Sequence, residues 1–342
     1  MVRNRSIAGL AAQGVLGAWL ILASACAPTV QSALPRAGAL DPPGFDVQAQ
    51  RFQSFDGARL GLSAWIPEGE EPWAVIVGLH GMNDYGEAFS YAGPWFAARG
   101  VAVYAYDARG FGRSPHRGLW AGEQLMSEDL RAAIAAVRRL HPDATLAVVG
   151  DSMGAAEAIT SLSAPDAPEV DRIVLVAPAV WGWSALPDVY AGVLWLAAHT
   201  LPGRAISPPR NLNRVPSDNI DMLRALGRDQ NMIFRTRIDA IYGLVRLMEQ
   251  AAQDIGALDA PTAFLYGEND QIVPRDAAEA AAARLPADAR TALYPNGYHM
   301  LLRDLQAEIV YEDVLSFLRD PAAPFPSDPE PVIARSAIQA NR

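Results

Sequence analysis

The chain of 342 residues has no lysine and a single cysteine, and only 19% of its residues are charged. Its 28 basic residues are therefore all arginines, and 38 acidic residues outnumber them to give a formal net charge of −10. An acidic chain without a basic stripe is not expected to bind nucleic acid. A lone cysteine forms no internal disulfide, so the stability of the fold has to come from its core.

The N-terminal residues have the pattern of an export signal. Arg3 and Arg5 precede an apolar stretch from about Ile7 to Ala25, and Cys26 follows it directly. The segment Leu22-Ala-Ser-Ala-Cys26 resembles a bacterial lipoprotein signal. It predicts a lipidated Cys26 that anchors the protein to a membrane of the bacterial cell envelope, facing the periplasm or the exterior. Ordinary signal-peptidase cleavage, which gives a secreted or soluble periplasmic protein, and an uncleaved membrane anchor are the alternatives.

Composition divides the chain into segments. A Pro-, Ala- and Gly-rich stretch without periodicity follows the cysteine, and a stretch with five prolines ends the chain. We expect a signal peptide at 1–25, the lipidated cysteine and a tether at 26–46, an α/β core at 47–179 and 257–319, a helical cap at 180–256 and a flexible tail at 320–342.

Between the two ends, apolar runs of strand length alternate with amphipathic stretches such as the helix expected at Gln124–Leu140. Arg51–Phe55 and Arg59–Ile66 predict an antiparallel hairpin. Six further runs predict strands that are buried on both faces: Trp73–Leu79, Val101–Tyr106, Thr145–Val149, Arg172–Ala177, Thr262–Tyr266 and Thr291–Tyr294. This alternation predicts an α/β fold in which a mostly parallel sheet lies between two layers of helices.

Residues 180–256 break the alternation. They contain no clear strand but have helix-like stretches at Ile220–Leu226 and Ile238–Ala252, which predicts a helical cap over the sheet. The aromatic side chains of this segment either pack within the cap or line an apolar substrate pocket. The candidates for such a lining are Trp181, Trp183 and Trp195.

The pentapeptide Gly150-Asp-Ser-Met-Gly154 follows the strand expected at Thr145–Val149 directly. A serine at a sharp turn from strand to helix has its hydroxyl pushed out of the sheet, where a base can reach it. Small residues are needed on both sides because the turn is strained and the helix packs closely. Ser152 is therefore the candidate nucleophile.

A serine nucleophile needs a base, and the chain has only five histidines. His80 ends a strand, His116 lies in a loop, His141 lies at a helix end, and His199 lies within residues 180–256. His299 alone lies in a loop at the carboxyl end of a strand and late in the chain. We therefore predict that His299 is the base, and that a helix follows it at Leu301–Leu318.

The acid that orients this base is expected between the serine and the histidine in the chain. Asp270 leaves the carboxyl end of the strand at Thr262–Tyr266 and is placed to accept a hydrogen bond from an imidazole nitrogen. The alternatives are that Asp270 caps the helix expected near Pro274, and that Glu268 is the acid although it stands closer to the strand.

An oxyanion hole needs two backbone N–H groups that converge on one point. Met153, directly after the nucleophile, supplies one from the start of a helix. Met82 supplies the other from the loop after the strand at Trp73–Leu79, where Gly81 allows a close backbone approach. The two methionine side chains can add apolar surface beside a bound acyl chain.

Five segments occur in the order that is typical of α/β-hydrolases: His80-Gly-Met, Asp107–Ser114, Gly150–Gly154, Gly267–Pro274 and Gly297-Tyr-His299. Within that superfamily the chain resembles the monoacylglycerol lipase and lysophospholipase branch, over roughly Phe52–Leu318. The resemblance implies a three-layer α/β-hydrolase fold with a helical cap.

Carried over residue by residue, the resemblance implies a triad of Ser152, Asp270 and His299, with Met82 and Met153 at the oxyanion hole. Two positions depart from the family pattern. Asp151 replaces a histidine that is frequent before the nucleophile, and Ala155 replaces a frequent second glycine. A carboxylate beside Ser152 disfavours anionic substrates unless it points away from the site.

The expected reaction is hydrolysis of carboxylic esters of apolar acyl groups, such as a monoacylglycerol or lysophospholipid, through an acyl-enzyme, with no metal or cofactor required. A peptidase or amidase is an alternative because the triad does not distinguish esters from amides. A haloalkane dehalogenase or epoxide hydrolase shares the fold but uses an aspartate as its nucleophile. Ser152 at that position argues against this alternative. A non-catalytic, envelope-anchored binding protein is the alternative outside the enzymes, and the complete set of Ser, Asp and His argues against it.

Overall fold

The computed structural model describes residues 27–35, 41–207 and 214–333. Within them, nine strands form one sheet in the order β1-β2-β3-β5-β4-β6-β7-β10-β11. All neighbouring strands from β5 to β11 are parallel, whereas β3 runs antiparallel to β5. The predicted mostly parallel sheet is confirmed.

The predicted strands agree with the observed ones to within two residues at each end. The structure adds β1 in the segment that we expected to be a tether, where it pairs with β2. The strands of this sheet are β1 (Gly44–Asp46), β2 (Arg51–Gln53), β3 (Arg59–Trp65), β4 (Ala74–Leu79), β5 (Val101–Tyr106), β6 (Thr145–Asp151), β7 (Arg172–Val176), β10 (Thr262–Gly267) and β11 (Arg290–Tyr294).

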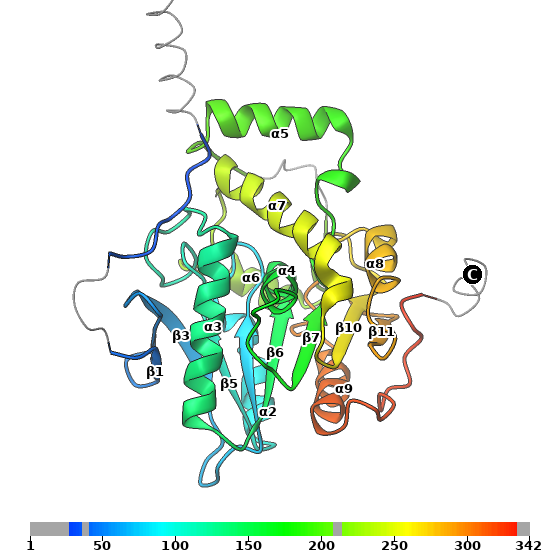
Figure 1. Cartoon of the computed structure of the whole chain (residues 1–342). Helices are drawn as coiled ribbons and strands as arrows, with labels where there is room; N and C mark the ends of the chain where they lie inside the picture. Colours follow the sequence, from blue (N-terminus) through cyan, green and yellow to red (C-terminus); the bar gives the residue numbers. More distant parts are fainter. Residues whose placement is uncertain (1–26, 36–40, 208–213, 334–342) are drawn as a thin grey trace, which may run out of the picture.

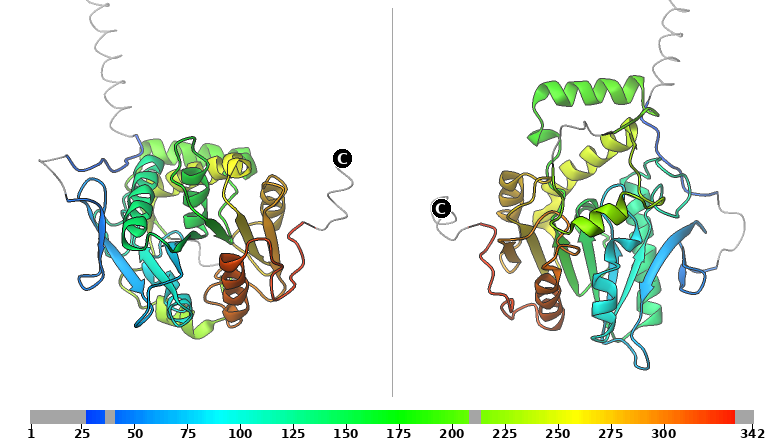
Figure 2. Two further views of the ribbon diagram at one scale, coloured as in Figure 1. Left: turned by 60° about the horizontal axis from the view of Figure 1, so that its bottom comes forward. Right: turned by 180° about the vertical axis from the view of Figure 1, so that it is seen from behind.

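Helices cover both faces of the sheet (Figure 1, Figure 2). Side chains of β4 alternate between two cores: Val75 and Val77 join one, and Ala74 and Ile76 join the other. Both faces of the strand are therefore buried, which explains its continuous apolar run. The first core includes α3 (Glu123–Leu140), α4 (Met153–Leu162) and α8 (Arg275–Ala282), and the second includes η1 (Gly86–Phe89), α2 (Ala92–Ala97) and α9 (Ala307–Arg319).

The insertion between β7 and β10 forms the cap. In Figure 1, α7 lies over the core and α5 lies beyond α7, on the outside of the molecule. The two predicted cap helices are confirmed as α6 and α7, but β8 and β9 pair as a short antiparallel ladder where no strand was expected. The cap elements are η2 (Trp183–Ala185), α5 (Asp188–Thr200), β8 (Ala205–Ile206), α6 (Ile220–Leu226), β9 (Thr236–Arg237), α7 (Ile238–Asp254) and η3 (Ile255–Ala257).

The helix predicted at Leu301–Leu318 begins later than expected, because α9 starts at Ala307. The preceding residues form turns whose side chains are fixed by distant partners. Arg303 is buried and pairs with Asp84. Asp304 accepts hydrogen bonds from the Ser217 hydroxyl at 2.6 Å and from the Tyr298 N–H at 2.7 Å. These contacts hold the chain in turns and delay the helix.

Both chain ends pack against the core over the parts that the structure describes. The Gln31 side chain is buried and donates to the Leu119 carbonyl at 2.7 Å. Near the other end, Phe325 and Val332 are buried, and the Leu293 N–H donates to the Glu330 carbonyl at 2.8 Å. Contacts with the core therefore hold these described parts of the predicted tether and of the predicted flexible tail.

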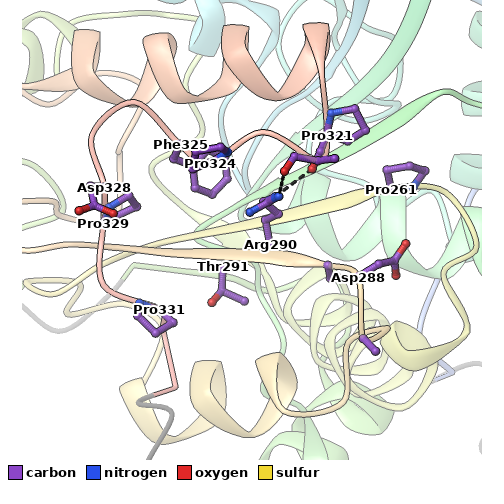
Figure 3. A pocket seen from close by; sticks show the side chains of 13 residues that line it. Pro261, Asp288, Arg290, Thr291, Pro321, Pro324, Phe325, Asp328, Pro329 and Pro331 are labelled. Atoms are coloured by element: carbon purple, nitrogen blue, oxygen red, sulfur yellow. Dashed lines mark hydrogen bonds between the residues drawn. The ribbon is translucent and has the colours of Figure 1, made fainter.

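The tail also closes one side of a cavity at the start of β11 (Figure 3). There the Arg290 Nε donates to the Pro321 carbonyl at 2.8 Å, and its guanidinium also binds the Ala322 carbonyl. This cavity lies at the amino ends of β10 and β11. The predicted catalytic residues follow the carboxyl ends of the strands, at the opposite edge of the sheet.

Candidate active site

Ser152 lies in a strained turn between β6 and α4. Its φ of 54° is in the left-handed region, which is sparsely populated by residues other than glycine. A Cβ on Gly154 would lie 2.2 Å from the Leu79 carbonyl oxygen, and one on Gly150 would lie 2.5 Å from the Ala155 backbone. Both flanking glycines are therefore required for the close packing that holds this turn.

Ser152, His299 and Asp270 form one hydrogen-bonded chain. Nε2 of His299 lies 3.0 Å from Oγ of Ser152, and Nδ1 lies 2.8 Å from Oδ2 of Asp270. If the Nδ1 proton is donated to Asp270, Nε2 is left as the acceptor for the serine proton. The three residues follow the carboxyl ends of three different parallel strands, so the sheet sets their spacing.

The other carboxylate at this strand end, Glu268, lies away from the histidine. Its Oε1 is 3.4 Å from Nη1 of Arg275, and its side chain is about half exposed. Asp270 is held instead by its own loop, since its Oδ1 accepts from the N–H groups of Ile272 at 2.7 Å and Val273 at 3.0 Å. Asp270 thus turns its second oxygen to His299, and this contact favours it over Glu268 as the orienting acid.

The surroundings of His299 favour its protonated form. Burial by itself would lower the pKa of this imidazole. The hydrogen bond and charge of Asp270, together with the charge of Asp151, outweigh burial and raise the pKa above its ordinary value. This arrangement can take a proton from the serine and stabilise the resulting imidazolium.

Asp151 belongs to a buried group of charges beside the nucleophile. Burial raises the pKa of Asp151 to about 6, against the opposing charges of Arg303 and His299. Oδ1 of Asp151 and Nη1 of Arg303 are buried, and neither has a hydrogen-bond partner in the described part of the chain. Asp151 is only 6% exposed, so little of its carboxylate is open to direct contact with an incoming substrate.

The loop that carries Met82 runs directly beside Ser152. A Cβ on Gly81 would lie 3.4 Å from the Cβ of Ser152, and Met153 is the first residue of α4. Within the described ranges, the N–H groups of Met82 and Met153 donate to no backbone carbonyl. Both remain available to a ligand, so the predicted oxyanion hole is compatible with the geometry and stays a prediction.

The three tryptophans predicted for a substrate pocket lie in different surroundings. Trp181 and Trp183 are half-buried against the core, and the Trp183 ring lies 5.3 Å from the Tyr242 ring of α7. Trp195, on α5, is 53% exposed and stacks on His199 with ring centroids 4.3 Å apart. A side chain as exposed as that of Trp195 does not line an enclosed pocket. A lining role for Trp181 and Trp183 stays a prediction.

A structural histidine supports the loop after β4. His80 is buried, its Nε2 accepts from the Ala108 N–H at 2.9 Å, and its Nδ1–H donates to the Gly81 carbonyl at 2.8 Å. Burial lowers the pKa of His80. Sequence reasoning set this residue aside as a base and missed its role in the loop, although His80 begins one of the five segments that are typical of α/β-hydrolases.

The parallel sheet, the cap and the Ser–His–Asp contact define the class of α/β-hydrolases. The model of the family Hydrolase_4, described as serine aminopeptidase, S33, matches residues 70–306. That range covers more than half of the chain, and the chain belongs to this family.

Two curated relatives are similar to the chain in sequence, and one solved structure is similar to it in fold. The chain is 25% identical over 280 residues to a monoacylglycerol lipase of Mycolicibacterium smegmatis, covering 78% of the chain and 95% of the relative. It is 24% identical over 258 residues to a monoglyceride lipase of Mus musculus, covering 73% and 82%. A structure of a soluble variant of monoglyceride lipase from Saccharomyces cerevisiae superposes with a TM-score of 0.65 at 17% identity, over 85% of this chain and 100% of that one.

The predicted lipidation site, Cys26, lies outside the described residues. Among the helices that the structure does describe, none is both long enough and apolar enough to cross a membrane.

Proposed function

We propose that the chain is a serine hydrolase that cleaves carboxylic esters of apolar acyl groups through an acyl-enzyme. The observation that carries this proposal is the hydrogen-bonded chain from Ser152 through His299 to Asp270, with spacings of 3.0 Å and 2.8 Å. A hydroxyl, a base and an orienting carboxylate at these spacings are the elements of nucleophilic acyl transfer.

In the proposed reaction, Oγ of Ser152 attacks the ester carbonyl carbon while Nε2 of His299 takes the hydroxyl proton. The N–H groups of Met82 and Met153 stabilise the tetrahedral oxyanion. His299 then protonates the leaving alcohol, and Ser152 retains the acyl group. Water, deprotonated by His299, attacks the acyl-enzyme and releases the carboxylic acid.

The proposed substrates are monoacylglycerol- or lysophospholipid-like esters. This choice is supported by the names of the two curated relatives, both of which are lipases for monoacylglycerols. The half-buried side chains of Met82, Trp181 and Trp183 supply apolar surface beside the site and in the cap.

The description of the family as a serine aminopeptidase supports a second candidate, hydrolysis of peptides or amides. Comparing turnover of monoacylglycerols and p-nitrophenyl esters with turnover of aminoacyl amides distinguishes the two. We expect esters to be cleaved with the higher kcat/KM. Faster cleavage of the aminoacyl amides would favour the peptidase.

Labelling with a serine-reactive fluorophosphonate tests the hydrolase proposal. We expect the wild type to be labelled, and Ser152→Ala and His299→Ala to be unlabelled. Ser161→Ala is the matched control, because Ser161 lies on α4 and its hydroxyl has no partner within the described residues. A folded wild type that takes up no label would instead favour a non-catalytic binding protein.

We also propose that the protein is a lipoprotein of the bacterial cell envelope, anchored through Cys26 and facing the periplasm or the exterior. Figure 1 and both views of Figure 2 place the start of the described chain, residues 27–35, beside one end of α5. This helix carries an exposed apolar surface. The side chains on it that are more than half exposed are Val189, Tyr190, Val193, Trp195 and Leu196.

Metabolic labelling with a clickable fatty acid tests the anchor. We expect the wild type to be labelled and to sediment with membranes, and Cys26→Ser to lose the label. A soluble, unlabelled wild type would support the secreted or periplasmic alternative, and label that persists in Cys26→Ser would contradict lipidation at this cysteine.

A further inference from the structure

The loop that carries Met82 is held by the cap. We call residues 80–85 the oxyanion loop and residues 229–236 the cap turn. The Ile233 N–H donates to the Asn83 carbonyl at 3.0 Å. The Asn83 side-chain amide donates to Oγ1 of Thr236 at 2.8 Å. Asn83 directly follows Met82, so both bonds act one residue from the proposed oxyanion donor.

A third bond joins the same two segments. The Tyr85 hydroxyl donates to Oδ2 of Asp229 at 2.6 Å, and Tyr85 is buried. Oδ1 of the same carboxylate accepts from the Asn231 N–H at 2.8 Å. Asp229 therefore ties the beginning of the cap turn to the end of the oxyanion loop.

The cap turn is itself held in one shape by Arg117. The guanidinium donates to three successive carbonyls of the turn, those of Gln230 at 2.7 Å, Asn231 at 3.0 Å and Met232 at 2.7 Å. It also donates to the Gly112 carbonyl at 3.1 Å, in the loop after β5. A turn that is already rigid can position a second loop well, because the turn loses little conformational entropy when the two bind each other.

The backbone of Asn83 is held by its own turn, in which the Asp84 N–H donates to the Gly81 carbonyl at 3.2 Å, as well as by the cap. Its φ of 66° lies in the left-handed region, where asparagine is tolerated better than most residues but is still strained. Released from the cap, this residue can relax toward the ordinary region with negative φ. Such a rotation turns the peptides on either side of Asn83, and the Gly81–Met82 peptide that carries the Met82 N–H is the next one along the chain.

We propose that Thr236 and Asn83 are positioning residues that couple the placement of the cap to the oxyanion hole. With the cap turn docked, the Met82 N–H points to the site of the oxyanion. With the cap turn displaced, the donor is lost although the triad is intact. This inference rests on the proposed hydrolase function and adds the cap as a condition for its acyl-transfer step.

The test compares Thr236→Val, which keeps the shape of the side chain and removes the hydroxyl, with Thr236→Ser, which keeps the hydroxyl. We expect kcat on a p-nitrophenyl ester to fall about tenfold or more in Thr236→Val with KM nearly unchanged, since losing one oxyanion donor entirely costs about 10²- to 10³-fold. Thr236→Ser is expected to restore most of the rate.

A trifluoromethyl ketone supplies a readout that general destabilisation of the fold does not move. Ser152 adds to its carbonyl, and the hemiketal oxyanion that forms occupies the proposed hole. We expect the affinity of Thr236→Val for this inhibitor to fall by the same factor as kcat/KM. Ser184→Ala is the matched control, because it removes a cap hydrogen bond, from Oγ to Oε2 of Glu249 at 2.9 Å, that involves neither the cap turn nor the oxyanion loop.

Asn83→Gly removes the side-chain amide that donates to Thr236, and glycine suits a left-handed backbone. It provides the test if Thr236→Val fails to fold. The inference is overturned if the folded variants keep wild-type kcat and inhibitor affinity, or if only KM rises. Failure of the hydrolase proposal is distinct, because the wild type itself would then neither take up fluorophosphonate nor cleave the ester.

Discussion

The carboxylate of Asp270 uses its two oxygens for different tasks. One accepts from the backbone of its own loop, and the other lies 2.8 Å from Nδ1 of His299. The loop contacts fix the carboxylate independently of its contact with the histidine. The imidazole is thereby kept in the tautomer that leaves Nε2 free to accept the serine proton.

Replacing Asp270 by Asn is expected to reduce kcat about 10³- to 10⁴-fold, because the amide no longer holds the correct tautomer or stabilises the imidazolium. Glu268→Gln is the matched control, since Glu268 pairs with Arg275 and stands two residues away. Steady-state kinetics on a p-nitrophenyl ester measure kcat for both variants. A large loss in Glu268→Gln with little change in Asp270→Asn would reverse the assignment of the acid.

The pH dependence of activity reports the charge of Asp151. Only the neutral imidazole accepts a proton, so kcat/KM is expected to rise with pH through the pKa of His299, which is raised above 6.5. Asp151→Asn removes one of the charges that raise this pKa. The rising limb of the pH profile of kcat/KM is therefore expected to move to lower pH in Asp151→Asn. A limb that does not move, or that moves to higher pH, would contradict the conclusion that this carboxylate raises the pKa of His299.

At the scale of elements, the turn from β6 to α4 depends on the contact between α4 and β4. Gly154→Ala would place a Cβ 2.2 Å from the Leu79 carbonyl oxygen. We expect it to lower the free energy of unfolding by about 1–3 kcal/mol and to slow fluorophosphonate labelling. Urea denaturation and the rate of labelling measure the two effects.

Gly192→Ala is the control in a helix, because a Cβ there would meet nothing within 4 Å. It is expected to raise the free energy of unfolding by up to about 1 kcal/mol through helix propensity and to leave labelling unchanged. Equal behaviour of the two variants would contradict the packing argument for Gly154.

The elements that the sequence predicted well are those defined by local pattern. β5 was predicted with its observed bounds because its side chains enter cores on both faces, which leaves one continuous apolar run. The start of α9 was missed because it depends on the contacts of Arg303 and Asp304 with distant residues. No periodicity within the helix could reveal those partners.

At the scale of the whole molecule, a parallel sheet gathers the carboxyl ends of its strands at one edge. The order of Ser152, Asp270 and His299 at three strand ends was therefore enough to predict that they meet. The bonds that join the cap to the oxyanion loop were not predictable in this way. Asn83 and Thr236 are 153 residues apart, and neither belongs to a motif.

The proposal that Ser152 carries the acyl group is tested most directly by mass spectrometry of the protein quenched with acid during hydrolysis of a p-nitrophenyl ester. We expect the peptide that contains Ser152 to gain the mass of the acyl group in the wild type and not in Ser152→Ala. Turnover with no acyl group on that peptide, or hydrolysis by Ser152→Ala at the wild-type rate, would contradict it.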